Sequence, residues 1–352
     1  MSNISVSKMK IFKDCKLEFK YKYIDKWVPT DDKKEDVTAK GLVMHQCFED
    51  ILKYENYVPG WDEVKLENTL VPCKDKSIPK KIIPEEEVLK ILKTAMEKNK
   101  LSIQVAKEYR LKLGLKRWLS FKHDYLDKRN SILYAEKEYK LTLFKRPDGE
   151  EVVTTAILDL LEELEDGNYC IYDYKTPQKA NNSNYKAQLL VYAYVQATAL
   201  GLVGTDIEEA CKTIADRFKI YVFYPLLEGL EEDYTNSLKQ VKFKAEDVKK
   251  AIDELKETDV NIGEFDFSQN AVQLQPTTPK FTCDWCEYCG SKKQTINGEV
   301  FEGCPITAFA GCICKHEFKR PEKKESLIEK EKERISTILS IPIGVPKEEE
   351  KK

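Results

Sequence analysis

Asp159, Asp173 and Lys175 have the residue types and the spacing of a metal-dependent hydrolytic site. Lys175 follows Asp173 by two residues in a predicted strand, so both side chains are expected on one face of a sheet. Carboxylates suit a hard cation such as magnesium, which neutralises charge on a scissile phosphate and acidifies a water molecule. A lysine can then orient that water or help to deprotonate it. Together the three residues are the smallest set of functional groups that could catalyse phosphodiester hydrolysis.

The strands that must position these residues form a predicted hairpin. Residues 152–164 and 169–175 are typical of strands, and Glu165-Asp166-Gly167-Asn168 between them is a strong hairpin signal. With Asp166 near the apex, Asp159 and Asp173 fall opposite each other, within one residue of register. Residues 132–145 are predicted to form the strand before this hairpin, so three consecutive strands are expected.

Helical patterns flank these strands. Residues 38–55, with Thr38 as N-cap, form the predicted first core helix. Its apolar positions are Leu42, Val43, Cys47, Phe48, Ile51 and Leu52. Further helices are expected over 85–98, 102–128, 185–200 and 245–257, and a buried strand over 218–224. The core order is therefore helix, three strands, helix, strand, which predicts an α/β fold.

The composition is that of a folded protein with no overall attraction to nucleic acid. The 352 residues are 34% charged and 41% apolar, and the formal net charge is −3, so any contact with DNA must rest on a local basic surface. Without an apolar run of membrane-spanning length or a secretory signal, we expect a cytoplasmic protein that does not bind membranes. In a reducing compartment the eleven cysteines favour metal or iron-sulfur binding over disulfides.

Two further motifs accompany the aspartates. In Gly41-Leu42-Val43-Met44-His45 a histidine follows a glycine by one helical turn, and Gln188 and Tyr192 lie four residues apart on one face of the helix after the third strand. Each motif alone is more typical of ordinary packing, and Asp-x-Lys alone also occurs at exposed strand ends. Their order along the chain is more specific than any one of them.

This order resembles the motifs of RecB-like nucleases of the PD-(D/E)XK superfamily. Gly-x-x-x-His in a first helix, Asp in a second strand, Asp-x-Lys in a third and Gln-x-x-x-Tyr in the next helix are similar to the arrangement in AddAB-type, CRISPR-associated RecB-like and phage exonucleases. The resemblance covers about residues 5–225 and implies a restriction-endonuclease-like core. The family usually has glycine three residues before the strand-two aspartate, where this chain has Ala156.

The resemblance also implies roles for individual residues. His45, Asp159, Asp173 and the carbonyl of Tyr174 would hold Mg²⁺ or Mn²⁺, and Lys175 would act on the attacking water. Gln188 and Tyr192 would position Lys175 or the DNA strand. Glu136 or Glu138 in the first strand is either an additional acidic residue of the site or part of a solvated strand face.

The C-terminal cysteines resemble the triplet that many RecB-like nucleases combine with a distant N-terminal cysteine to bind a [4Fe-4S] cluster. The ligands would be Cys15, Cys283 and Cys286, with Cys289 or Cys304 as the last, because the spacing departs from the usual short gap. A structural zinc site of Cys283, Cys286, Cys289 and Cys304 is the alternative. Cys312 and Cys314, beside His316, are expected to be bystanders, and Cys47, Cys73, Cys170 and Cys211 ordinary thiols.

These observations predict five consecutive segments. They are an N-terminal segment with the first core helix (1–55), a helical insertion (56–131), the nuclease core (132–270), a Cys-rich metal or iron-sulfur element (271–316) and a charged flexible tail (317–352).

The expected function is a metal-dependent DNA exonuclease, a hydrolase that acts on single-stranded ends in recombination, repair or replication-linked end processing, with a possible helicase or recombinase partner. One alternative is a catalytically inactive DNA-binding or assembly subunit with the same fold. Another is a zinc-centred interaction module in which Asp-x-Lys is accidental, but it leaves the His45 and Gln188 motifs unexplained.

Overall fold

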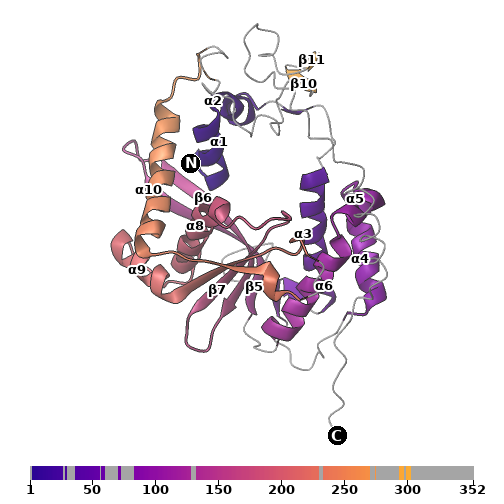
Figure 1. Cartoon of the computed structure of the whole chain (residues 1–352). Helices are drawn as coiled ribbons and strands as arrows, with labels where there is room; N and C mark the ends of the chain where they lie inside the picture. Colours follow the sequence, from indigo (N-terminus) through magenta and orange to yellow (C-terminus); the bar gives the residue numbers. More distant parts are fainter. Residues whose placement is uncertain are drawn as a thin grey trace. The chain divides into compact units, whose positions relative to one another are not determined.

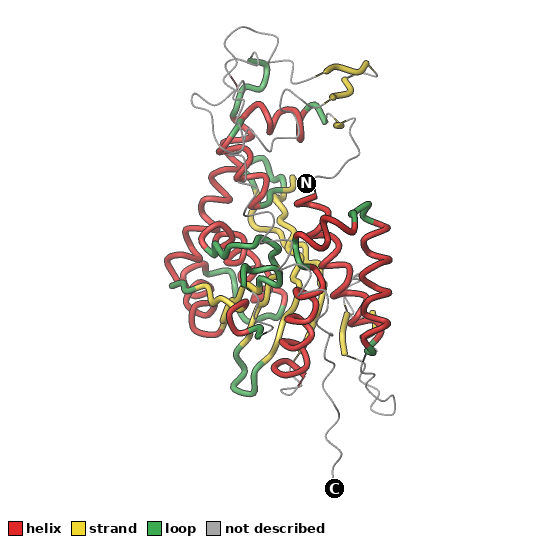
Figure 2. Tube along the Cα trace, turned by 45° about the vertical axis from the view of Figure 1, so that its right-hand side comes forward, coloured by secondary structure: helices red, strands yellow, loops and turns green. Residues whose placement is uncertain are grey.

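The computed structural model describes residues 2–26, 28–29, 36–55, 57–59, 70–72, 83–127, 132–229, 233–269, 274, 293–296 and 299–302. These residues form two compact units, shown as a cartoon in Figure 1 and as a tube in Figure 2. Unit 1 contains the described residues of Met1–Lys34, Thr142–Thr154 and Ile252–Lys324. Unit 2 contains those of Glu35–Leu141 and Thr155–Ala251, and therefore all the predicted catalytic residues.

The larger sheet has a five-stranded core in the order β5-β6-β7-β8-β9, and these strands belong to unit 2 apart from one end each of β5 and β6. Its strands are β5 (Ile132–Lys145), β6 (Glu151–Glu163), β7 (Tyr169–Tyr174), β8 (Phe218–Phe223) and β9 (Leu238–Val241), and a β3 (Tyr57–Pro59) and β4 (Leu70–Pro72) hairpin extends the β5 edge. β6 and β7 are antiparallel, whereas β7 and β8 are parallel. The mixed α/β class and the three consecutive strands are confirmed; β3, β4 and β9 were not predicted.

Helices cover both faces of these strands. Buried residues of α3 (Asp36–Tyr54), α4 (Glu85–Lys98) and α6 (Leu111–Phe121) share one core cluster with Cys170, Tyr172 and Tyr174, which alternate along β7. α8 (Ser183–Ala199) and α9 (Ile207–Arg217) connect β7 to β8 and lie on the other side of the strands in Figure 1. All six residues of β7 are consequently buried, as expected for a central strand covered on both faces.

The first core helix has the apolar face that its sequence predicts. Val43, Cys47, Phe48, Ile51 and Leu52 are buried in α3. Leu42 is the exception, with 39% of its surface exposed. None of the helices in the described ranges has both the length and the apolar character needed to cross a bilayer.

The single helix predicted over 102–128 is wrong. Three pieces replace it: α5 (Ile103–Glu108), α6, and the π-helical turn η2 (Lys122–Leu126). The break lies at Arg110, whose φ of 56° is in the left-handed region, where an L-residue cannot continue a right-handed helix. Position 110 is neither glycine nor proline, so the apolar periodicity on its two sides resembles that of one continuous helix. The predicted helical insertion also contains β3 and β4.

Several short elements of unit 1 were not predicted from the sequence. They include β1 (Ser2–Asn3), α1 (Val6–Asp14), α2 (Lys16–Phe19) and the π-helical turn η1 (Lys20–Ile24). Ser5 caps α1 by accepting a hydrogen bond from Lys8 N. Phe12 packs edge-on against Phe19 and Phe265, with ring centroids 5.3 and 5.7 Å away. Part of α10 (Ala245–Glu264) also lies in this unit, where Asp259 accepts from Arg146 Nη2 at 2.7 Å.

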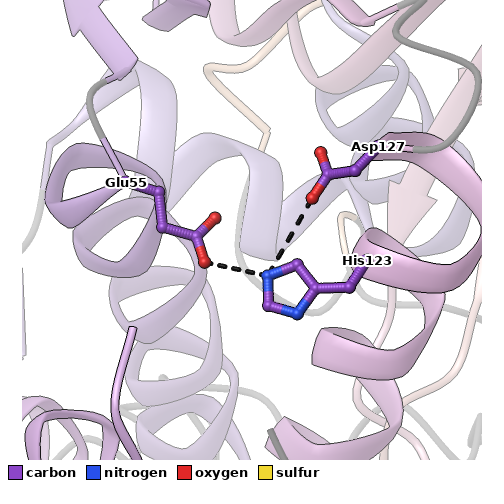
Figure 3. A group of neighbouring side chains, drawn as sticks. All are labelled: Glu55, His123 and Asp127. Carbon is purple, nitrogen blue, oxygen red and sulfur yellow. Dashed lines mark hydrogen bonds and ion pairs between the residues drawn. The ribbon is translucent and has the colours of Figure 1, made fainter. Parts of the chain in front are cut away.

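A buried charged cluster in unit 2 ties the end of α3 to η2. Figure 3 shows Glu55, His123 and Asp127, with Glu55 Oε1 2.8 Å and Asp127 Oδ2 3.9 Å from His123 Nε2. Their spacing would suit a metal ion, but a cation is already in place. The Lys122 ammonium pairs with Glu55 Oε2 and lies 2.8 Å from Asp127 Oδ2, and its side chain is fully buried. We therefore assign this cluster as an ion-pair network that stabilises the fold.

Glu55→Gln should lower the free energy of unfolding by about 3 kcal/mol, because it removes one of the two carboxylates that pair with the buried Lys122 ammonium. Burial would raise the pKa of Glu55, but its contacts with His123 and Lys122 outweigh burial and lower that pKa below its ordinary value near 4.5. The stabilisation is therefore present above about pH 4.5 and lost as the pH falls through the lowered pKa. Urea unfolding at neutral and acidic pH measures this difference.

Glu49→Gln in α3 is the matched control, because Glu49 forms an exposed i,i+4 pair with Lys53. Its effect should stay below about 0.5 kcal/mol. Equal losses in the two variants would contradict the assignment of Glu55 to a buried network.

Candidate functional site

The hairpin of β6 and β7 places the two predicted aspartates opposite each other. Leu160 pairs with Tyr172 and Leu161 with Ile171 in antiparallel register. Continuing that register by one residue brings Asp159 opposite Asp173, so their side chains share a face of the sheet. The turn that fixes the register is held by Asp166, whose Oδ1 accepts from Asn168 N at 3.0 Å, and by Gly167 at a φ of 75°.

Lys175 forms an ion pair with Asp173. Its Nζ lies 3.0 Å from Asp173 Oδ1 and 2.8 Å from Oδ2. The Lys175 backbone continues the pairing of β7 with β8, because its N–H donates to Phe223 O at 2.9 Å. The alternation of the strand thus gives Asp173 and Lys175 a common face, as their spacing predicted.

Burial and like charge shape the electrostatics of this pair. Asp173 and Asp159 are only 3% and 8% exposed. Burial, followed by the negative charge of Asp159, raises the pKa of Asp173 to about 6. Burial would lower the pKa of the Lys175 ammonium, but the carboxylates of Asp173 and Asp159 raise it above its ordinary value. Lys175 is therefore protonated and positively charged in the site.

α3 brings His45 to the same point. His45 Nε2 lies 3.1 Å from the Tyr174 carbonyl oxygen and Nδ1 lies 3.5 Å from Asp159 Oδ1. The glycine one turn earlier permits this approach, because a Cβ at Gly41 would lie 3.3 Å from Thr176 Oγ1. An alanine at position 41 would require the Thr176 side chain to give way by a few tenths of an ångström.

α8 closes the site with a row of polar side chains. Gln188 Nε2 donates to Tyr192 Oη at 2.8 Å. Burial and then the charge of Asp173 raise the pKa of the Tyr192 phenol, so Tyr192 is neutral near the carboxylates. Tyr185, one turn before Gln188, also belongs to the site, because the Lys175 ammonium lies 5.2 Å from the centroid of its ring. This residue was not predicted. The i, i+3, i+7 spacing of Tyr185, Gln188 and Tyr192 was the signal that could have identified it.

The donor set suits a hard divalent cation. Two carboxylates, the Tyr174 carbonyl and the His45 imidazole meet here, and oxygen-rich sets of this kind bind Mg²⁺ or Mn²⁺. The buried Asp173 Oδ2 has no hydrogen bond, although Lys175 Nζ is close to it. Two carboxylates facing one ammonium also leave negative charge that a cation would balance. On both grounds the residues present fit the metal.

Other predicted residues lie elsewhere or outside the described ranges. Ala156, three residues before Asp159, is fully buried in β6. Glu138 Oε1 lies 3.6 Å from Lys140 Nζ, which favours a solvated strand face for Glu138, and the side chain of Glu136 is outside the described side chains. Cys47, Cys170 and Cys211 are buried as expected.

Of the predicted cluster ligands, only Cys15 falls within the described ranges. It is half-buried at the start of α2, where its Sγ accepts from Glu18 N at 3.4 Å. Cys283, Cys286, Cys289 and Cys304 lie outside the described residues, as does Cys73.

Comparison with known proteins identifies a related family. A search of curated proteins finds no match. The model of one protein family does match, the PD-(D/E)XK nuclease superfamily, over residues 3–291. That range includes every residue of the site just described and most of the 352 residues. The chain therefore belongs to the PD-(D/E)XK nuclease superfamily.

Proposed function

We propose that this protein hydrolyses phosphodiester bonds of DNA at the site formed by Asp159, Asp173 and Lys175. The observation that carries the proposal is the register of β6 and β7, which sets two buried carboxylates opposite each other beside one ammonium. His45, Asp159, Asp173 and the Tyr174 carbonyl would hold Mg²⁺ or Mn²⁺. A cation bound there supplies Lewis-acid stabilisation of the phosphate and a more acidic water.

The protein's own residues would position the reactants. The raised pKa of Lys175 keeps it charged, so it would donate hydrogen bonds that orient the attacking water or a phosphate oxygen. Tyr192 accepts from Gln188, which leaves its phenol hydrogen available to a carboxylate or phosphate oxygen. Burial of the carboxylates limits water access and strengthens each of these contacts.

The narrower features of the proposal rest on the resemblance to RecB-like nucleases. The expected substrate is DNA with a single-stranded end, and the expected cleavage is exonucleolytic. The process would be recombination, repair or replication-linked end processing, together with a helicase or recombinase partner.

Digestion of end-labelled single-stranded, duplex and circular DNA, with and without Mg²⁺, tests the proposal. Linear single strands should be shortened only when Mg²⁺ is present, and circles should survive. Asp173→Ala should reduce the rate by roughly a thousandfold, because a metal site contributes several kcal/mol to transition-state stabilisation. Glu165→Ala, at the exposed tip of the same hairpin, should keep the wild-type rate.

Absence of Mg²⁺-dependent cleavage of every substrate would instead indicate a catalytically inactive DNA-binding subunit. Wild-type turnover by Asp173→Ala would refute the site, and cleavage of circles would refute the requirement for an end.

We also propose that Cys15 is a ligand of a [4Fe-4S] cluster, with Cys283, Cys286 and Cys289 or Cys304 as the others. Protein purified without oxygen should be brown, and Cys15→Ala should lose the colour and the iron. Metal analysis of both samples decides the question. Stoichiometric zinc and no iron in both would show a self-contained zinc site at the C-terminal cysteines instead.

A further inference from the structure

The helical insertion carries an apolar groove that has no part in the catalytic site. Its apolar lining comes from Leu89, Leu92 and Met96, which are spaced by helical turns along α4, and from Ile103 and Ala106 of α5. The groove encloses about 320 Å³, which is in the range of small binding pockets. All its lining residues belong to unit 2.

Two large apolar side chains of this groove are exposed to solvent. Ile103 is 68% and Leu89 is 38% exposed. They account for two of the six exposed large hydrophobic residues found in the described part of the chain. Isolated exposed apolar residues are ordinary, but a group of them beside a groove is typical of a surface that binds a partner.

The rim of the groove is strongly basic. Lys93, Lys107, Arg110 and Lys112 line it, and no acidic residue does, although the whole chain has a net charge of −3. Arg110 is held in place because its Nη1 donates to Gly229 O at 3.0 Å. Glu97 Oε1 lies 4.0 Å from Lys93 Nζ and Glu85 Oε1 lies 3.7 Å from Lys112 Nζ, so two of these four cations have a long ion pair with an acidic residue beside the groove.

We propose that this groove binds an acidic amphipathic helix of a protein partner. The aliphatic stripe would take leucine- or isoleucine-sized anchors spaced by helical turns, and the four basic residues would face the acidic side chains beside them. A nucleic acid fits less well. Single strands bind through bases stacked on aromatic rings, and the groove has an aliphatic lining with no aromatic residue.

Fluorescence anisotropy with the full-length protein and a labelled 18-residue helical peptide of leucine and glutamate tests this inference. Ile103→Asp should weaken binding at least tenfold. Ile103 is the exposed first residue of α5, where an acidic side chain suits the helix N-terminus, so the variant should fold normally. Lys107→Glu should weaken binding severalfold, and added salt should weaken the wild type.

Lys90→Glu is the matched control, because Lys90 is an exposed lysine of α4 outside the groove; it should bind the peptide as the wild type does. DNA cleavage should be unchanged in all three variants, which separates this inference from the proposed nuclease activity. Failure of the peptide to bind, or equal affinity of wild type and Ile103→Asp, would overturn the proposal. Equal binding of a peptide with lysine in place of glutamate would also overturn it. Labelled oligothymidine provides the test for a nucleic acid in the groove. If it binds without metal, is displaced by the peptide and no longer binds to Ile103→Asp, the groove is a nucleic-acid site and the proposal is overturned.

Discussion

The burial of two carboxylates on adjacent strands is the constraint on which the site depends. Asp159 and Asp173 are both more than nine-tenths buried, and like charges so placed disfavour ionisation, as the raised pKa of Asp173 shows. Lys175 neutralises part of this charge. The remaining negative charge would favour binding of a divalent cation, as the proposed function requires.

The surrounding core holds this arrangement rigid. Phe48 of α3 stacks on Trp118 of α6 at a centroid separation of 4.6 Å and meets the edge of Tyr174 at 5.0 Å. Tyr174 thus packs against α3 through its ring and offers its carbonyl to His45. Gly114 permits the close packing of α6, because a Cβ there would lie 2.5 Å from Leu226 Cδ2. Such packing holds the side chains of the candidate site in one orientation, as the proposed catalysis would require.

The sequence predicted the parts of the fold that depend on local patterns. The hairpin followed from Asp166-Gly167 and from alternation, so Asp159 and Asp173 could be placed opposite each other before the structure was known. Features that depend on tertiary context could not be predicted. Arg110 adopts a left-handed conformation although it is not a glycine, and β9 is a short strand with two polar residues. α9, by contrast, has an N-cap at Asp206 and acidic residues in its first turn, so it could have been predicted. The contact of Lys175 with Tyr185 needs the packing of α8 on the sheet. Cluster ligands far apart in sequence cannot be paired from spacing alone.

Titration calorimetry with Mn²⁺ at neutral pH and at about pH 5 tests the central claim most directly. Protons compete with the cation for a carboxylate whose pKa is about 6, so the affinity of the wild type should fall by about tenfold at the lower pH. Asp173→Asn should lose the high-affinity site, whereas Lys175→Ala should bind at least as tightly because it removes positive charge. An affinity that is independent of pH, or wild-type binding by Asp173→Asn, would contradict a metal site on this buried carboxylate pair.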